Sequence, residues 1–539
     1  MGPFPLLLSR KERPEMATSQ ILEFTCVAAA ETPTPYADHS LTARLTAPSG
    51  QVYDVTGFWD GGINWKLRFV ADESGTWTWV TASDDPSLDS QTGSAEVAEG
   101  IDGVETAWKR HGPLAIGPTG RSFVHADGTP VFWLADTVWS APAHATAEEW
   151  STYVAHRAKQ GYNVLQINAL PQWDASGPPL REPFEMKGAR ADLTRANPAY
   201  FQALDAMVRE AAEAGLICSM VVLWFDNTDD DNLDWARKVP RRGPFTTEDA
   251  DRLGRYLAAR YEAFGTTWII SGDSSFQAPN AVALYDAAGA SVRAACARTP
   301  VMSAHLNGGT PPSEALHGRD WFDFVMFQSC HFRDSAERAI RYAATARAMT
   351  PAKPVLNSEP CYDSLQIMGD DNHDNQRFAR EDVRKASWVS LLGGASAGLT
   401  YGAHGIWPWH RTGQTYGPMH YGLPPDWQEA LPLDSGTDVV RLRTFFERLD
   451  WWDTVPADPL STEPASAMVA TAQVGDGMTL AYVAAPATVT LPGGPEPQAT
   501  WFDPATGERQ VAELTGDANA GWTVSPHGSA GDAVLELRS

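Results

Sequence analysis

Eight short apolar runs, separated by segments of helical period, constrain the fold of this chain more than any other feature. They lie between about residues 112 and 450 and read VFWLADT, VLQINAL, ICSMVVLW, TTWIISGD, VMSAHL, FVMFQSC, PVLNSEP and ASAGLTYGAHG. Between them lie helix candidates such as TAEEWSTYVAHRAKQG, with Thr146 as N-cap and Gly161 as stop. Apolar strands alternating with amphipathic helices indicate a parallel sheet buried on both faces. Eight such strands predict a (β/α)8 TIM barrel, an α/β fold, because the rival doubly wound sheet lacks its Gly-x-Gly-x-x-Gly motif.

Segments with a two-residue alternation flank this region on both sides. LTARLTAPSGQVYDVTGFWDG and NWKLRFVADESGTWTWVTAS predict antiparallel strands before it, and MTLAYVAA, ATVTLP and AVLELRS predict more after it. At 539 residues the chain is also too long for a single core. We therefore expect an N-terminal β-sandwich over residues 18–108, the barrel over 109–453 and a small C-terminal β domain over 454–539. Residues 1–17 are expected to lie outside these domains as a disordered or non-native terminus.

The charge balance excludes several kinds of partner. Forty-one basic and 67 acidic residues give a formal net charge of −26, which repels nucleic acid and anionic lipid. No apolar run approaches the length of a membrane span, and the first residues do not resemble a signal peptide. The five scattered cysteines contain no Cys-x-x-Cys motif, which favours reduced thiols. We expect a cytoplasmic protein without membrane or nucleic-acid partners, and homo-oligomerisation stays open.

Polar side chains end nearly every predicted strand of the barrel. The carboxyl ends of barrel strands share one face, where ligands bind. Asp273 ends the fourth strand and Glu359 the seventh, nearly opposite across that face. Glycoside hydrolysis requires such a pair, one acid to protonate the leaving oxygen and one carboxylate to attack or stabilise the anomeric carbon. The alternative is that each acid caps a helix or pairs with an arginine, although perturbed carboxylates concentrate in clefts.

The remaining strand ends supply candidate substrate-binding residues. They are Asp136, Trp139, Asn168, Gln172, Trp224, His305, Gln328, His331, Tyr401, His404 and Trp407. Each tryptophan taken alone could equally belong to the core. The run IWPWHRTGQTYGPMHYG, residues 406–422, is loop-like and aromatic, and it should overhang the pocket after the eighth strand. Its aromatic faces suit stacking on sugar C–H groups.

The sequence predicts no metal and no cofactor. Metal-dependent hydrolases on this barrel usually carry His-x-His on the first strand, where this chain has WLADTVW. The segment DDNHDNQRFARE, residues 370–381, loosely matches a calcium loop, but Asn375 replaces the glycine that the sharp turn needs. A solvated loop is the simpler interpretation. The chain also has no Gly-x-Ser-x-Gly or Walker motif, which disfavours acyl and phosphoryl transfer.

Five ordered motifs resemble the apiosidase-like glycoside hydrolases. They are FVHADGTPVFWLADTVW, QGYNVLQINALP, WIISGD, KPVLNSEPCYD and SLLGGASAGLTYGAHGIW. The resemblance implies a (β/α)8 catalytic domain between a β-sandwich and a small β domain. It implies Asp273 as general acid/base and Glu359 as nucleophile, with Asp136 on substrate hydroxyls. Tyr401 and His404 match its YG segment at the end of strand eight.

These observations predict an exo-acting, retaining glycosidase that removes apiose, another pentofuranose or a small pyranose from an oligosaccharide or glycoside. Retention predicts a carboxylate separation of about 5 Å, whereas a gap above roughly 6.5 Å indicates inversion. Two alternatives belong to other classes. One is a barrel that binds glycan without catalysis, which the presence of both acids opposes. The other is a metal-dependent hydrolase, which a chelator would inactivate.

Overall fold

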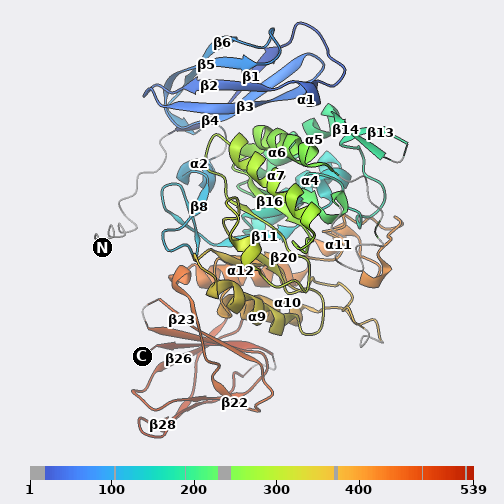
Figure 1. The fold of residues 1–539 in the computed structure, drawn as a ribbon. Coiled ribbons are helices and arrows are strands. Elements are labelled where there is room, and N and C mark those ends of the chain that lie inside the picture. The colour runs from blue at the N-terminus through green and yellow to red at the C-terminus, as the bar shows by residue number, and fades with distance from the viewer. Residues whose placement is uncertain are drawn as a thin grey trace.

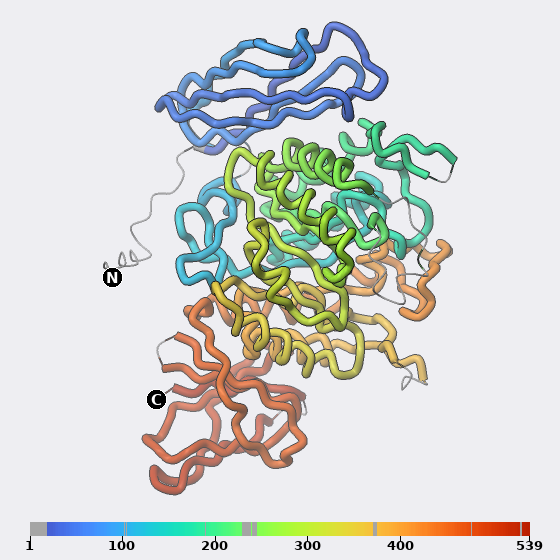
Figure 2. Tube along the Cα trace, viewed as in Figure 1, coloured from blue at the N-terminus to red at the C-terminus, as the bar shows by residue number. Residues whose placement is uncertain are grey.

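The computed structural model has a central barrel with an all-β domain at each end (Figure 1). It describes residues 18–101, 103, 105–188, 190–228, 239, 245–369, 374–475, 477–528 and 531–538. Residues 1–17, expected above to form a separate terminus, lie outside this set. The trace in Figure 2 shows the N-terminal domain in blue and the C-terminal domain in red, with the whole barrel between them.

The barrel consists of eight parallel strands, as the sequence predicts. They are β11 (Trp133–Thr137), β12 (Val164–Asn168), β15 (Ile217–Trp224), β16 (Thr267–Gly272), β17 (Met302–Ser303), β18 (Val325–Gln328), β19 (Val355–Glu359) and β20 (Gly398–Tyr401). Their order in the sheet is β17-β16-β15-β12-β11-β20-β19-β18. A parallel bridge between His305 and Met326 joins the two outer strands beyond β17 and closes the barrel. The fold is therefore a TIM barrel.

A helix follows each strand and covers the outside of the barrel. These helices are α4 (Ala147–Gln160), α5 (Pro198–Glu213), α6 (Thr247–Tyr261), α7 (Pro279–Ala295), α8 (Glu314–His317), α9 (Ser335–Ala348), α10 (Arg380–Leu392) and α12 (Asp434–Phe446). Helix α4 begins and ends where the sequence predicts. Thr146 and Glu149 form a reciprocal capping box at its start, and Gly161 ends it with a φ of 100° that favours glycine.

Alternation along the strands separates the barrel interior from the layer under the helices. Trp133 and Ala135 of β11 pack in the interior cluster, whereas Leu134 packs with the helices. A three-stranded sheet closes the amino-terminal end: β8 (Leu114–Ile116), β9 (Phe123–His125) and β10 (Pro130–Val131). From it, Phe123 contacts Trp133 and Phe324, with ring centroids 5.4 and 5.1 Å apart. The interior is thus a packed core, and ligands of this fold bind at the opposite, carboxyl-terminal end.

Shorter elements lie between these parts. They are α1 (Pro35–Asp38), α2 (Ala107–His111), α3 (Ala141–His144), the hairpin β13 (Phe184–Lys187) and β14 (Arg190–Ala196), and α11 (Trp427–Ala430). The hairpin and α3 both precede barrel helices, and α11 precedes α12. They lengthen the connections on the carboxyl-terminal side of the barrel, where a TIM barrel carries its ligand-binding loops.

The N-terminal domain is one mainly antiparallel sheet that bends back on itself to form two layers. Its strands are β1 (Thr18–Val27), β2 (Leu41–Thr46), β3 (Val52–Gly61), β4 (Asn64–Ala71), β5 (Gly75–Ser83), β6 (Thr92–Val97) and the short parallel β7 (Gly100–Ile101). The first half of β3 pairs with β2 and its second half with β4, so one seven-stranded sheet provides both layers. Trp65 and Trp77 are buried in the core between these layers. This arrangement is the sandwich that the alternating sequence predicts, with its two layers continuous through β3.

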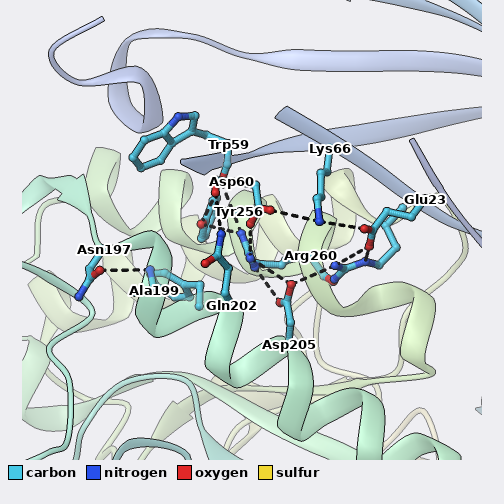
Figure 3. Close-up of polar contacts among 12 residues, drawn as sticks. Glu23, Trp59, Asp60, Lys66, Asn197, Ala199, Gln202, Asp205, Tyr256 and Arg260 are labelled. Atoms are coloured by element: carbon cyan, nitrogen blue, oxygen red, sulfur yellow. Dashed lines mark hydrogen bonds and ion pairs between the residues drawn. The ribbon is translucent and has the colours of Figure 1, made fainter. Parts of the chain in front are cut away.

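Ion pairs fasten this domain to the barrel (Figure 3). Asp205 of α5 accepts hydrogen bonds from Arg68 of β4 at 2.9 Å and from Arg260 of α6 at 2.7 Å. Arg260 also reaches Asp60 of β3 at 2.6 Å. Both guanidinium groups are almost fully buried. Because a buried cation without a counter-charge is costly, these contacts hold the two domains in one orientation.

The C-terminal domain contains two packed sheets. The six-stranded sheet has the order β21 (Val455–Ala457), β23 (Val469–Val474), β24 (Met478–Val483), β30 (Ala533–Arg538), β26 (Gln498–Phe502) and β27 (Arg509–Val511). The four-stranded sheet has the order β22 (Ser461–Glu463), β25 (Thr488–Leu491), β29 (Gly521–Val524) and β28 (Leu514–Asp517). Arg384 of α10 binds Asp532 at 2.8 Å and so links the larger sheet to the barrel. In Figure 1 this domain lies below α9 and α10.

Two further findings concern the described residues as a whole. No helix among them has both the length and the apolar character needed to cross a membrane. All five cysteines are free thiols, and four of them are buried. Buried thiols pack as small apolar side chains.

Candidate active site

Two carboxyl groups face each other at the open end of the barrel. Glu359 is the last residue of β19, and Asp273 directly follows β16. Both approach the same nitrogen, Nε2 of His305: Glu359 Oε2 lies 3.1 Å from it and Asp273 Oδ1 lies 3.9 Å from it. These two distances limit the separation of the two oxygens to at most about 7 Å, within the range over which paired carboxylates act on one glycosidic bond.

Each acid has its own hydrogen-bond partners. The hydroxyl of Tyr362 donates to Glu359 Oε2 at 2.6 Å, and Nε2 of His331 lies 3.0 Å from Oε1. The amide of Gln328 donates to Asp273 Oδ1 at 2.5 Å. Glu359 therefore accepts from three groups around it, and such bonding favours the ionised carboxylate.

The surroundings move the two pKa values in opposite directions. Burial, and then the nearby charge of Glu359, raise the pKa of Asp273 to about 7. Burial alone would raise the pKa of Glu359 as well, but its hydrogen bonds to His305 and His331 outweigh burial and lower it to about 2. Between the two pKa values, below about pH 7, the pair thus holds one proton, on Asp273, and one negative charge, on Glu359. The pair therefore offers one proton donor and one negatively charged carboxylate.

The backbone around Asp273 is unusual for a non-glycine residue. Its φ is 49°, in the left-handed region, and such strain persists only where the surrounding structure imposes it. The preceding Gly272 lies against the ring of Trp224, and a Cβ atom at this glycine would lie 1.9 Å from Cε3 of that ring. The close contact between strand end and indole therefore requires glycine, and it aims the following acid into the mouth.

Aromatic rings surround the acids on one side. Trp139 meets Trp224 edge-on with centroids 5.4 Å apart, and it meets His305 in the same way at 5.2 Å. All three side chains are buried. These rings exclude water from the side of the site next to His305, which strengthens the electrostatic interactions of both acids.

A second aromatic group comes from the loop after β20. The ring of Trp407 stacks on His404 with centroids 5.9 Å apart, and Tyr421 meets Trp407 edge-on at 5.8 Å. Tyr362, which binds Glu359, lies 6.4 Å from Trp407. Burial lowers the pKa of His404 well below its usual value, so this imidazole is neutral. The loop therefore brings an uncharged aromatic wall to the acid pair.

The described residues show no group of three or more His, Cys, Asp and Glu side chains that could hold a metal ion. The histidines of the mouth instead contact Glu359 and aromatic rings. The first residues of the loosely calcium-like segment, 370–373, lie outside the described residues. The arrangement can donate a proton and present a carboxylate on its own.

Comparison with known proteins assigns the chain to a family. The family model for the apiosidase-like catalytic domain matches residues 118–453, more than half of the chain. The chain belongs to the apiosidase-like glycoside hydrolases. A domain of unknown function, DUF5060, matches residues 16–84, within the N-terminal part. The chain matches no curated protein.

Solved structures share the fold of this apiosidase-like glycoside hydrolase. A family 5 glycoside hydrolase from Bacteroides vulgatus is 23% identical, with a TM-score of 0.66 over 81% of this chain and 95% of that chain. A second glycoside hydrolase from the same organism is 18% identical, with a TM-score of 0.68 over 97% of this chain and 98% of that one. At these identities the likeness supports the architecture, including the flanking β domains in the second case.

In this glycoside hydrolase, most of the sequence-predicted residues gather at the mouth. Asp273, Glu359, His305, Gln328 and His331 form one hydrogen-bonded group. The predicted aromatic residues flank that group, as described above.

Two further predicted residues lie close by: Asn168 ends β12, and Gln172 lies on the loop that follows. The amide Nδ2 of Asn168 donates to Oε1 of Gln172 at 3.1 Å, and both side chains are buried. The backbone N–H of Asn168 donates to the carbonyl of Trp139 at 3.1 Å, which brings this loop beside the aromatic group.

Two predicted substrate-binding residues lie elsewhere. Asp136 has no exposed surface, and its Oδ2 accepts hydrogen bonds from Arg157 Nε and the Tyr153 hydroxyl of α4, both at 2.6 Å. Tyr401 is buried beside the same guanidinium, with its ring centroid 5.5 Å from it. The alternation of β11 and β20 turns both side chains toward the helices. This placement corrects their expected role in substrate binding.

Sequence reasoning missed two groups of the mouth. Tyr362 lies three residues after Glu359 in the motif NSEPCYD, and its bond to the carboxylate depends on how the chain turns after β19. Asp174 follows the predicted Gln172 by two residues, and it is 4% exposed. The sequence signal that could have identified Asp174 is its position two residues after Gln172, which was itself a predicted binding residue.

Proposed function

We propose that this glycoside hydrolase is an exo-acting, retaining enzyme that releases a terminal apiose or another pentofuranose from an oligosaccharide or glycoside. Asp273 acts as the general acid/base and Glu359 as the nucleophile. One observation carries the proposal: two acids beside one histidine have opposite protonation preferences. A pair with one proton and one charge suits a two-carboxylate glycosidase.

The reaction proceeds in two steps. Asp273 donates its proton to the glycosidic oxygen while Glu359 attacks the anomeric carbon, so the C–O bond breaks and a glycosyl ester forms. Asp273, now ionised, takes a proton from water, and the hydroxyl oxygen attacks the anomeric carbon. The ester breaks, the free sugar leaves, and both carboxyl groups return to their first states.

The distances to His305 support retention. Retaining enzymes separate their carboxyl groups by about 5–5.5 Å and inverting enzymes by about 6.5–9.5 Å. Because Glu359 Oε2 and Asp273 Oδ1 lie 3.1 and 3.9 Å from the same nitrogen of His305, these two oxygens are at most about 7 Å apart, and so close an approach favours the shorter separation of a retaining pair. The hydrogen bond from Tyr362 also fits a nucleophile, because it fixes the carboxylate oxygen.

Contacts between two loops support exo action. Ser176, on the loop after β12, donates its N–H to the carbonyl of Pro408 at 2.9 Å, and Gly177 donates to that of Thr415 at 3.1 Å. These bonds join the loop after β12 to the loop after β20 and close that side of the mouth. A closed side suits a pocket for a terminal sugar, whereas an endo-acting enzyme needs a cleft open at both ends.

Two finer parts of the proposal have other support. Apiose or another pentofuranose is proposed because the catalytic domain is apiosidase-like. A cytoplasmic location, where the substrate would be an imported glycoside, is proposed because the cysteines are free and mostly buried thiols.

The test is hydrolysis of 4-nitrophenyl glycosides and of apiose- or arabinose-bearing oligosaccharides by wild type, Asp273→Ala and Glu359→Ala. We expect one terminal sugar to be released, with kcat/KM at least about 10³-fold lower in both variants. Proton NMR of the first product shows retention if the anomeric configuration is that of the substrate. Turnover that both variants retain would contradict the two-acid mechanism, and cleavage within a long chain would contradict exo action.

A further inference from the structure

The carboxyl group of Asp174 has no role in the two-acid mechanism, yet it is buried at the mouth. The side chain is 4% exposed, and its Oδ1 has no hydrogen-bond partner. A buried polar atom without a partner costs folding free energy, because it has given up its hydrogen bonds to water. A group of this kind, retained beside an active site, points to a ligand as its partner.

Neighbouring residues hold Asp174 at the edge of the active site. Trp173 packs edge-on against Phe225, which directly follows β15, with ring centroids 6.1 Å apart. Ser176 donates its N–H to the carbonyl of Pro408 on the loop after β20. Asp174 therefore lies on a short segment fixed at one side to the end of β15 and at the other to the overhanging aromatic loop.

The charges around Asp174 place it next to the acid pair. Burial raises the pKa of this carboxyl well above its usual value, and three acids raise it further: Asp273, Asp226 and Glu359. Asp174 in turn helps to raise the pKa values of the Tyr416 and Tyr421 hydroxyls, after burial. The carboxyl thus lies within electrostatic range of both the acid pair and the two tyrosines. In its neutral form it can both donate and accept a hydrogen bond.

Other buried polar atoms of the mouth also have no hydrogen-bond partner. The indole N–H groups of Trp224 and Trp407 are donors of this kind, and Oδ1 of Asn168 is an acceptor. Sugar hydroxyls donate and accept at once, so donors and acceptors placed around one mouth match them. An apolar ligand would leave these groups unbonded.

We propose that Asp174 is a substrate-binding residue that holds hydroxyl groups of the sugar bound next to Asp273 and Glu359. This inference rests on the proposed function in one respect: it requires that the sugar substrate binds at this mouth of the barrel. Because several carboxyl groups surround the site, the sugar held by Asp174 is an uncharged one with adjacent hydroxyls.

The test separates sugar binding from catalysis by using the Glu359→Ala variant as background. Binding of apiose, arabinose and xylose is measured by calorimetry in this background, with and without Asp174→Ala or Asp174→Asn. Asp517→Asn, at the exposed end of β28 in the C-terminal domain, is the control. Thermal unfolding of each Asp174 variant and of the control is measured in the otherwise wild-type chain.

We expect Asp174→Ala to weaken binding of the best sugar about 10- to 100-fold, and Asp174→Asn, which keeps a donor and an acceptor, to restore part of it. The unfolding temperature of Asp174→Ala should equal or exceed that of wild type, because an unpartnered buried oxygen is removed. Equal sugar affinity with and without Asp174 would overturn the proposal. So would a fall in affinity together with a lower unfolding temperature, or background protein that binds none of the three sugars. Failure of the two-acid mechanism would appear instead as turnover by Asp273→Ala and Glu359→Ala.

Discussion

At the scale of single residues, the neighbours of Asp273 and Glu359 shift the pKa values of these two similar acids in opposite directions. Asp273 and Glu359 are both buried, but only Glu359 contacts two histidines and a tyrosine hydroxyl closely. The same burial therefore leaves one acid protonated and the other ionised. The roles proposed for them follow from this difference, which the residue types alone do not contain.

The first prediction concerns pH. We expect kcat/KM to fall on the alkaline side near pH 7, because Asp273, whose pKa is raised to about 7, loses the proton that it must donate. The acidic limb should lie far below the usual pKa of a glutamate, because the pKa of Glu359 is lowered to about 2. The measurement is a pH profile of kcat/KM below saturation.

The control uses a 2,4-dinitrophenyl glycoside of the sugar that is released, because this leaving group needs no proton. Asp273→Ala should show measurable turnover of this substrate, and its profile should lack the alkaline limb. An alkaline limb that persists in Asp273→Ala would assign the titration near pH 7 to another group.

The second prediction concerns His331. Its contact with Glu359 Oε1 helps to lower the pKa of that carboxyl, so His331→Ala should move the acidic limb to higher pH. We expect kcat/KM to fall about 10- to 100-fold at neutral pH. His331→Gln, which keeps an N–H donor, should move the limb less. Identical acidic limbs in wild type and His331→Ala would contradict this role.

At the scale of elements, strand ends and helix starts set the shape of the mouth. The start of α4 is tied to the loop after β20, because Glu149 accepts hydrogen bonds from Arg411 at 2.7 Å and from Trp409 at 3.3 Å. The same carboxylate completes the capping box of α4. One residue thus joins a barrel helix to the loop that overhangs the site.

The third prediction tests this link. Glu149→Ala should loosen the loop after β20 and raise KM about 10-fold, although Glu149 is not expected to touch substrate. Thr146→Ala is the matched control, since it removes the other half of the capping box and leaves the bond to Arg411. The control should lower stability by about 1 kcal/mol with unchanged KM. Equal KM values in both variants would contradict the link.

The fourth prediction tests the glycine at the end of β16. Gly272→Ala forces a Cβ atom to within 1.9 Å of the Trp224 ring, so either the ring or the strand end must move. We expect kcat/KM to fall by at least about 100-fold, because displacement of a catalytic group by about 1 Å has this effect. Gly531→Ala, where the added atom meets nothing within 4 Å, is the control and should behave as wild type. Full activity of Gly272→Ala would show that the strand end tolerates the shift.

At the scale of the whole molecule, buried ion pairs fix the flanking domains to the barrel. The carboxylate of Asp205 accepts hydrogen bonds from two arginines at once, Arg68 of the N-terminal sheet and Arg260 of α6. Figure 3 shows Asp205 and Arg260 at this junction. The C-terminal domain uses the pair of Arg384 and Asp532 in the same way. Both domains therefore stabilise the outside of the barrel, on surfaces formed by its helices.

The fifth prediction follows from this arrangement. Asp205→Ala leaves Arg68 and Arg260 buried with less counter-charge, and we expect it to destabilise the protein by about 3–5 kcal/mol, measured as a lower thermal unfolding temperature. Asp54→Ala, which removes the exposed pair with Arg44, should leave the unfolding temperature unchanged. Activity of folded Asp205→Ala at low temperature should match wild type. Similar unfolding temperatures in the two variants would contradict the role of the network.

Patterns along the chain were enough to predict the barrel, its strand ends and the two acids at those ends. Eight apolar runs with helical segments between them admit few other folds, and the parallel strands of a barrel bring their ends to one face. Gly272 followed by Asp273 and the motif NSEPCYD mark two of those ends directly. Local patterns of this kind can be recognised in the sequence because each depends on residues that are neighbours along the chain.

The contacts of each side chain at those ends follow from the three-dimensional arrangement and could not be predicted from the pattern. Asp136 and Asp273 both end barrel strands, yet one binds Arg157 under a helix and the other faces the mouth. That Oδ1 of Asp174 lacks a hydrogen-bond partner depends on where all of its neighbours lie in space. Which face a side chain takes depends on strand register and on loops distant in sequence. For that reason the sequence pattern predicts where the site lies, but it does not predict the contacts of every residue in it.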